Sequence, residues 1–214
     1  MALLESNTTA TNNRDNIYGS SRFEGQTFTI GTTATDGNYN ITSTKWKIWK
    51  TGSPGTITAV LKAVDGDGLP TGSDLSTGTY AGNTLTASSA GEVIEISMSS
   101  YEMQETTQYA IYLKATDGDS SNKIGSKFNY QGNPYSGGTW IATSSGDGGW
   151  GIQSSTSDFY FEVYGTAATA GTKFQINKDD VWKDVSAIKI NVDDAWKNVT
   201  AANINVDDAW KAIF

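Results

Sequence analysis

The chain has 214 residues, enough for one ordinary β-domain with an appendage or for two modest domains. Its formal net charge of -8 disfavours binding to nucleic acid and to anionic membrane surfaces. It contains no cysteine and no histidine, which excludes disulfides, thiolate chemistry and imidazole-based catalysis or metal ligation. Aromatic residues make up 11% of the chain and charged residues only 18%, a composition that indicates a folded protein.

No stretch of the sequence has the length and apolar character of a signal peptide or of a membrane span, so we expect no membrane insertion. If a protein without a signal peptide works outside the cell, we expect it to leave the cell by lysis or as part of a particle.

Residues 1–20 are polar and rich in asparagine and threonine. Because no hydrophobic period is visible, we predict an N-terminal arm or linker. An arm that becomes ordered only on a partner surface is the alternative interpretation.

Residues 21–166 change to short stretches of alternating polar and apolar residues, separated by Gly, Ser, Asp and Asn. Phe28 and Ile30 fall on one face of a predicted strand, and Trp46 and Ile48 share a face of the next. The stretch 56–64 is apolar on both faces, as in a strand between two layers. Short strands without intervening helices predict an all-β, antiparallel sandwich, for which we favour a jelly-roll-like arrangement over an immunoglobulin-like one.

One glycine-rich loop of this predicted sandwich contains three carboxylates, Asp65, Asp67 and Asp74. Alternating carboxylates and backbone carbonyls can hold Ca²⁺, whereas a solvated turn needs no metal. The loop lacks the distal glutamate of an EF-hand, so the turn is the simpler interpretation, and we expect no other cofactor.

Paired carboxylates can also hydrolyse glycosides. The candidates here lie in turns without apolar neighbours to raise a pKa, and we predict no enzyme activity.

Four aromatic residues lie in or beside the Gly- and Ser-rich segment 130–151, namely Tyr130, Tyr135, Trp140 and Trp150. Exposed rings on the loops of a β-sandwich can stack on sugars. The alternative is that these rings close one end of the sandwich and belong to its core.

The last 42 residues, 173–214, repeat one motif three times at a constant spacing of 14 residues. The copies are Ile176–Lys183, Ile190–Lys197 and Ile204–Lys211. A fixed short period indicates one supersecondary unit that must stack on a neighbour to bury its apolar face.

A two-residue Asp-Asp turn predicts a hairpin in each copy, with Asn191 opposite Trp196 and Ile190 opposite Lys197 in the second. The isoleucines Ile176, Ile190 and Ile204 then share an aliphatic face, while Trp182, Trp196 and Trp210 stand alone on the other. These six residues are our candidates for assembly. The tryptophans could be covered by the sandwich, by copies of the chain or another particle protein, or could form a sugar-stacking row.

Several separated motifs resemble a known β-sandwich module. They are Trp49–Gly55, Asp65–Leu75, Asn133–Gly138 and Asp158–Gly165. The module is found in surface-anchored bacterial and archaeal proteins and in phage proteins, and is described as a choice-of-anchor or carbohydrate-binding-like domain. The resemblance covers roughly residues 20–165 and implies a jelly-roll display or binding domain without naming a ligand.

The C-terminal copies resemble the short Trp-Lys repeats near the ends of phage tail-fibre proteins, with Asp-Asp where those relatives often have Gly-Gly. Together the two resemblances imply a phage virion structural protein, a tail fibre, head fibre or capsid decoration, that assembles through its repeats, its N-terminal arm or both. Its partners would be other virion proteins and copies of itself, in a virion or extracellular setting. The alternative is a carbohydrate-binding adhesin module that contacts host surface glycans.

Overall fold

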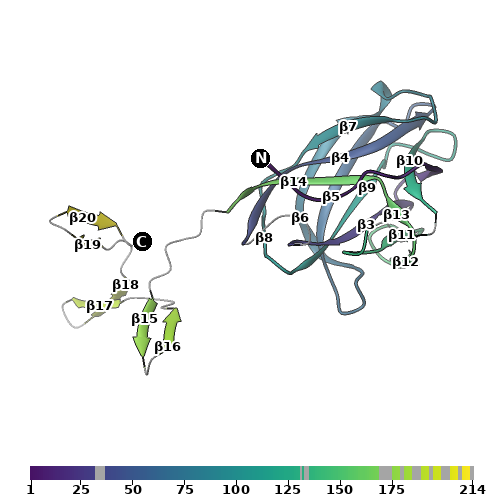
Figure 1. The fold of residues 1–214 in the computed structure, drawn as a ribbon. Coiled ribbons are helices and arrows are strands. Elements are labelled where there is room, and N and C mark those ends of the chain that lie inside the picture. Colours follow the sequence, from purple (N-terminus) through teal and green to yellow (C-terminus); the bar gives the residue numbers. More distant parts are fainter. Residues whose placement is uncertain are drawn as a thin grey trace. The chain divides into compact units, whose positions relative to one another are not determined.

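A computed structural model describes residues 1–31, 37–130, 132 and 135–168, together with the backbone of six short strands between residues 175 and 212. The chain divides into two compact units, Met1–Ala168 and Thr169–Phe214 (Figure 1). The described residues include no helix long and apolar enough to cross a bilayer.

The first unit is a sandwich of two sheets in which every strand pairing is antiparallel (Figure 1). The eight-stranded sheet comprises β1 (Ala2–Asn7), β2 (Asn12–Ile17), β4 (Tyr39–Thr51), β7 (Glu92–Ser97), β8 (Glu102–Met103), β10 (Lys123–Asn129), β13 (Asp158–Phe159) and β14 (Phe161–Ala167). The six-stranded sheet comprises β3 (Phe23–Thr29), β5 (Thr56–Val64), β6 (Pro70–Ala81), β9 (Gln108–Lys114), β11 (Trp140–Thr143) and β12 (Gly151–Ser154). One short 3-10 turn, η1 (Gly82–Thr84), follows β6.

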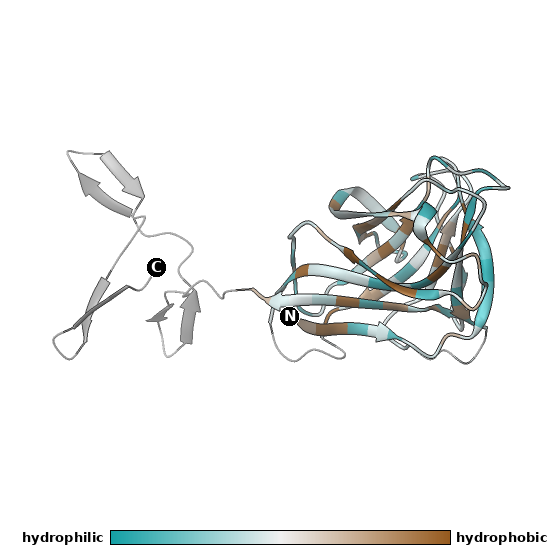
Figure 2. Cartoon of the chain, turned by 90° about the horizontal axis from the view of Figure 1, so that it is seen from above, coloured by the Kyte–Doolittle hydropathy of each residue, from teal (hydrophilic) through white to brown (hydrophobic). Residues whose placement is uncertain are grey.

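The main core lies between the two sheets, and polar and apolar residues succeed one another along their strands (Figure 2). Phe28, Trp46, Ile48 and Ile96 are all buried in this core, as the period-2 pattern predicts. The all-β class and the antiparallel two-sheet sandwich predicted from the sequence are thus confirmed.

A second apolar cluster lies on the other face of the six-stranded sheet. In β5, Leu61 belongs to the main core and its neighbour Val60 to the second cluster; in β9, Ile111 and Tyr112 divide in the same way. Because successive side chains of a strand point to opposite faces, these strands are apolar on both faces. Trp150, the residue before β12, belongs to the second cluster and packs on Tyr112 and Phe23.

Residues 1–20 do not form the arm or linker that we predicted. Strand β1 pairs with β14, and β2 pairs with β10. Leu4 and Ile17 are buried in the main core, with 0% and 1% exposure. Arg14 and Asn16 on β2 point toward a polar partner, the Glu24 carboxylate. The alternation of polar and apolar residues that marks a strand is therefore missing from this part of the sequence.

A buried polar network fastens β13 to β3 and β1. The side-chain amide of Gln26 donates to Asp158 Oδ1 at 2.7 Å, and the backbone N–H of Tyr135 donates to Asp158 Oδ2 at 3.2 Å. Gln26 Oε1 in turn accepts from the backbone N–H of Phe159, and Asn7 donates to the Phe159 carbonyl. The side chains of Asn7 and Gln26 thus form buried hydrogen bonds with residues 158 and 159, which joins the N-terminal strands to β13 near the end of the sandwich.

In the second unit the structure describes three separate two-stranded antiparallel sheets. They are formed by β15 (Gln175–Lys178) with β16 (Val181–Asp184), β17 (Lys189–Val192) with β18 (Ala195–Asn198), and β19 (Asn203–Val206) with β20 (Ala209–Ala212). Asn191 lies opposite Trp196 and Ile190 opposite Lys197, which is the register that a two-residue turn requires. The turn residues themselves and the packing of the repeats lie outside the described residues.

Asp158 makes the stability of the sandwich depend on pH. Burial raises the pKa of Asp158, and the hydrogen bonds from Gln26 and Tyr135 oppose this without cancelling it. A carboxyl group whose pKa is raised by folding stabilises the fold fully below its unfolded pKa of about 4, and this contribution is lost as pH rises through the folded pKa. We therefore expect the free energy of unfolding to fall as pH rises from about 4 through the folded pKa of Asp158. Urea denaturation at a series of pH values between about 4 and 8 measures this change.

Asp158→Asn is expected to flatten this part of the pH profile. At neutral pH this substitution should also lower the free energy of unfolding by about 1–3 kcal/mol. Both oxygens of Asp158 accept hydrogen bonds, from Gln26 and from the Tyr135 N–H, so the NH2 group of asparagine would face one of these two donors. The control is Glu105→Gln, which changes an exposed carboxylate and should keep the wild-type slope. Parallel profiles for wild type and Asp158→Asn would contradict the assignment.

Gly125 on β10 makes room for a large ring. It pairs with Trp49 on β4, and a Cβ added at Gly125 would overlap the Trp49 indole. Gly125→Ala should therefore destabilise the protein by about 1–3 kcal/mol through overpacking. Gly66→Ala is the matched control, because a Cβ there meets no atom within 4 Å. Equal urea midpoints for the two variants would show that the ring yields without cost.

Candidate functional site

Three of the four aromatic residues proposed for glycan stacking belong to the interior. Trp140 lies against Phe128 in the main core, and Trp150 lies against Tyr112 with ring centroids 4.7 Å apart. Tyr135 packs on Phe161 and donates its hydroxyl to Glu5. Of the four, Tyr130 alone is exposed, at 65%. The other three are buried, as the alternative interpretation predicts, but Trp140 and Tyr135 belong to the main core and Trp150 to the second cluster, so they do not together close one end of the sandwich.

The three aspartates do not share one loop as predicted, because Asp74 lies on strand β6 whereas Asp65 and Asp67 lie in the turn before it. Asp65 Oδ1 accepts hydrogen bonds from the backbone N–H groups of Asp67 and Leu69, which closes a tight turn. Asp74 forms ion pairs with Lys62 at 3.5 Å and with Lys114 at 3.8 Å. Among the described residues, no three acidic side chains are grouped so that they could hold a metal ion.

The assembly candidates of the repeats, Ile176, Ile190, Ile204, Trp182, Trp196 and Trp210, lie on described strands. The structure fixes their backbone pairing, and their side chains lie outside what it describes.

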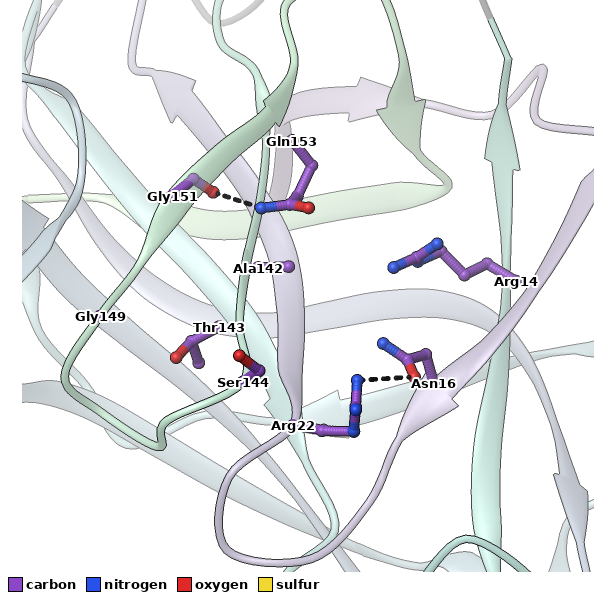
Figure 3. Close-up of a pocket in the computed structure, with 9 residues that line it drawn as sticks. All are labelled: Arg14, Asn16, Arg22, Ala142, Thr143, Ser144, Gly149, Gly151 and Gln153. Atoms are coloured by element: carbon purple, nitrogen blue, oxygen red, sulfur yellow. Dashed lines mark hydrogen bonds between the residues drawn. The ribbon is translucent and has the colours of Figure 1, made fainter.

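A pocket that the sequence analysis did not anticipate lies between the two sheets, beside the free edges of β2 and β12 (Figure 3). Its volume is about 300 Å³. Two arginines, two side-chain amides and two hydroxyl-bearing residues make up most of its lining. The full set is Arg14, Asn16, Arg22, Ala142, Thr143, Ser144, Gly149, Gly151 and Gln153.

The buried carboxylate of Glu24 organises one wall of the pocket. Arg14 Nε donates to both oxygens of Glu24 at 2.7 and 2.8 Å, and Asn16 Nδ2 donates to one of them at 2.8 Å. Burial raises the pKa of Glu24, and the Arg14 charge acts in the opposite direction. Because Glu24 belongs to the six-stranded sheet and Arg14 to the eight-stranded one, this contact joins the sheets at their open edge.

Aromatic rings hold both guanidinium groups of the pocket. The Arg14 guanidinium lies 4.5 Å from the Trp140 ring centroid, and that of Arg22 lies 5.4 Å from the Tyr18 centroid. Arg22 also donates to Asn16 Oδ1 at 3.3 Å. Among the described residues, the Nη groups of Arg14 have no hydrogen-bond acceptor, and Figure 3 shows both arginines directed toward the pocket.

The opposite wall comes from β11, β12 and the loop between them. Asp147 fixes this loop by accepting a 2.7 Å hydrogen bond from the Tyr112 hydroxyl and by facing Lys62 at 3.7 Å. The Thr143 hydroxyl donates to the Gly148 carbonyl within the same loop. Ser144 and Gln153 therefore project from a supported segment and not from a loose one.

The arrangement can bind an anion or a hydroxyl-rich molecule, because it offers fixed cationic donors on one side and neutral polar groups on the other. A signal for it existed in the sequence: Arg14 and Arg22 are the chain's only arginines, the other basic residues being lysines. Their common location could not be read from the chain, since it depends on which strands pair.

Comparisons with protein-family models, with curated proteins and with solved structures find no match to this chain.

The turn interpretation of the aspartate loop makes a direct prediction. Asp65→Ala removes the acceptor of two backbone N–H groups and should lower the free energy of unfolding by about 1–2 kcal/mol. Asp67→Ala should change it by less than about 0.5 kcal/mol, because the structure gives that exposed carboxylate no partner among the described residues. Neither Ca²⁺ nor a chelator should shift the melting temperature of either variant or of wild type. A rise in the wild-type melting temperature with Ca²⁺ would favour the metal interpretation.

Proposed function

We propose that this chain is a structural protein of a phage particle, of the tail-fibre, head-fibre or capsid-decoration type, which displays its β-sandwich and assembles through its C-terminal repeats. The observation that carries the proposal is the constant 14-residue period, which coincides with three separate hairpins.

The hairpins are too small to be stable by themselves. Each has two strands of four residues, and an isolated two-stranded hairpin is at best marginally stable in water. The sequence pattern adds a bulky tryptophan to each copy at the same position, and burial of such a ring is strongly favourable. A partner surface that repeats with the same period, such as copies of this chain, would cover the tryptophans of all three hairpins at once.

The sandwich is suited to display because it has a core of its own. Strands β1 and β2 are integral to it, so we no longer assign residues 1–20 a role as an assembly arm. Assembly is assigned to residues 173–214 alone.

Charge supports the same division. Residues 1–172 carry 9 basic and 16 acidic side chains, a net charge of -7, whereas residues 173–214 carry 6 and 7, a net charge of -1. A nearly neutral segment associates with copies of itself at little electrostatic cost, while the acidic sandwich favours solubility and keeps nucleic acid away. The proposed partners are copies of the chain and other virion proteins, and the proposed location is the virion.

The proposal predicts that the full chain forms an oligomer and that deletion of residues 173–214 yields a monomer. Sedimentation velocity over a hundredfold range of concentration measures both. The truncated chain should keep the far-ultraviolet dichroism of a folded β-protein, since the core of the sandwich is retained.

A triple variant of the full chain tests the tryptophans separately. Trp182→Ala, Trp196→Ala and Trp210→Ala together should weaken the oligomer at least tenfold, whereas Lys183→Gln, Lys197→Gln and Lys211→Gln together should leave it intact. A full chain that sediments as a monomer at every concentration would overturn the proposal.

A further inference from the structure

We propose that the pocket between β2 and β12 binds a carboxylate-bearing sugar residue, such as a uronic acid unit of a surface polysaccharide. This inference goes beyond the assembly function and does not depend on it. It also assigns glycan recognition to a place other than the four aromatic residues considered from the sequence.

The charge of the pocket favours a ligand with a single negative charge. Arg14 and Arg22 contribute two positive charges, and Glu24 beneath them contributes one negative charge, so the site has a net charge of +1. A carboxylate balances this charge, whereas a phosphate monoester near its dianionic form exceeds it. In a chain with a net charge of -8, concentration of both arginines at one place creates a local attraction for an anion.

The donors are already oriented for binding. The Arg14 guanidinium is fixed along one edge by Glu24 and over one face by Trp140, which leaves its Nη groups for a ligand. Arg22 is held by Tyr18 and Asn16. A planar guanidinium held in this way can bind a carboxylate through two parallel hydrogen bonds and loses less side-chain entropy on binding than a free one.

The remaining lining favours hydroxyl groups on the ligand. Gln153 donates its amide to the Gly151 carbonyl, which leaves the amide oxygen as an acceptor, and the exposed Ser144 hydroxyl has no partner among the described residues. Both lie across the pocket from the arginines (Figure 3). The volume of about 300 Å³ is at the small end of ligand sites, which suits one sugar ring and not an extended chain.

The test is a titration of the full chain with a panel of uronic acids and N-acetylneuraminate, each paired with its methyl ester. The ester keeps the ring and hydroxyls and removes only the charge. Isothermal calorimetry measures affinity, and amide chemical shifts locate the site. We expect millimolar binding by at least one acid, at least tenfold weaker binding by its ester, and shift changes centred on residues 142–153.

Two variants and one control connect binding to the pocket. Arg22→Gln removes a charge whose partners are Asn16 and Tyr18, and should weaken binding of the acid about tenfold, as expected for one charge-assisted hydrogen bond. Gln153→Ala removes the proposed acceptor on the opposite wall and should also weaken binding of the acid. Because this side chain is exposed, the substitution should not disturb folding even if Arg22→Gln proves unstable. Lys47→Gln removes the same charge outside the pocket and should bind as wild type does.

Four outcomes would overturn the proposal. They are the absence of binding by every acid in the panel, equal binding of acid and ester, equal effects of Arg22→Gln and Lys47→Gln, and binding of acetate or sulfate as tightly as the sugar acid. The last would identify an anion site without sugar recognition.

Discussion

The six-stranded sheet has to be covered on both faces, and much of the sandwich follows from this constraint. Strands β5 and β9 carry apolar side chains on either side, so one face meets the eight-stranded sheet and the other needs a separate cover. The segment between β11 and β12 supplies it, with Trp150 in the second cluster and Asp147 bound to Tyr112. That same segment then forms a wall of the pocket, so a requirement of packing places the polar groups that face the arginines.

Glu24 connects stability and binding at the open edge of the sandwich. A carboxylate with no exposed surface is costly unless it is paired, and Arg14 and Asn16 provide the pairing from the other sheet. Removal of Arg14 would leave that charge buried with the neutral Asn16 amide as its remaining side-chain donor. The contact that joins the sheets therefore also holds the guanidinium in position, which explains how an exposed edge can carry an ordered polar site.

The two units divide the proposed roles. The sandwich contains its own core, the polar network around Asp158 and the pocket, whereas the second unit contains the three hairpins to which we assign assembly. Assembly and ligand binding can thus vary independently, and many copies of a weak site on one assembly would bind a repetitive polysaccharide with far greater avidity than one copy. Weak affinity for a single sugar is compatible with a role in surface attachment on these grounds.

The class of the fold and the backbone pairing within each repeat could be predicted from the sequence, because both depend on short-range order. Alternation marks the inward faces of β3, β4 and β7, and the two-residue turn predicted at each Asp-Asp pair sets which residues oppose one another in a hairpin. Tertiary structure alone decided the rest. Strands β1 and β2 are recognised only through pairing with residues more than a hundred positions away, and the burial of Trp140, Trp150 and Tyr135 depends on what covers them. The pocket has the same origin: Arg14 and Arg22 stand out in the sequence, but a meeting of strands from two sheets brings them to Ser144 and Gln153, and no local pattern encodes that meeting.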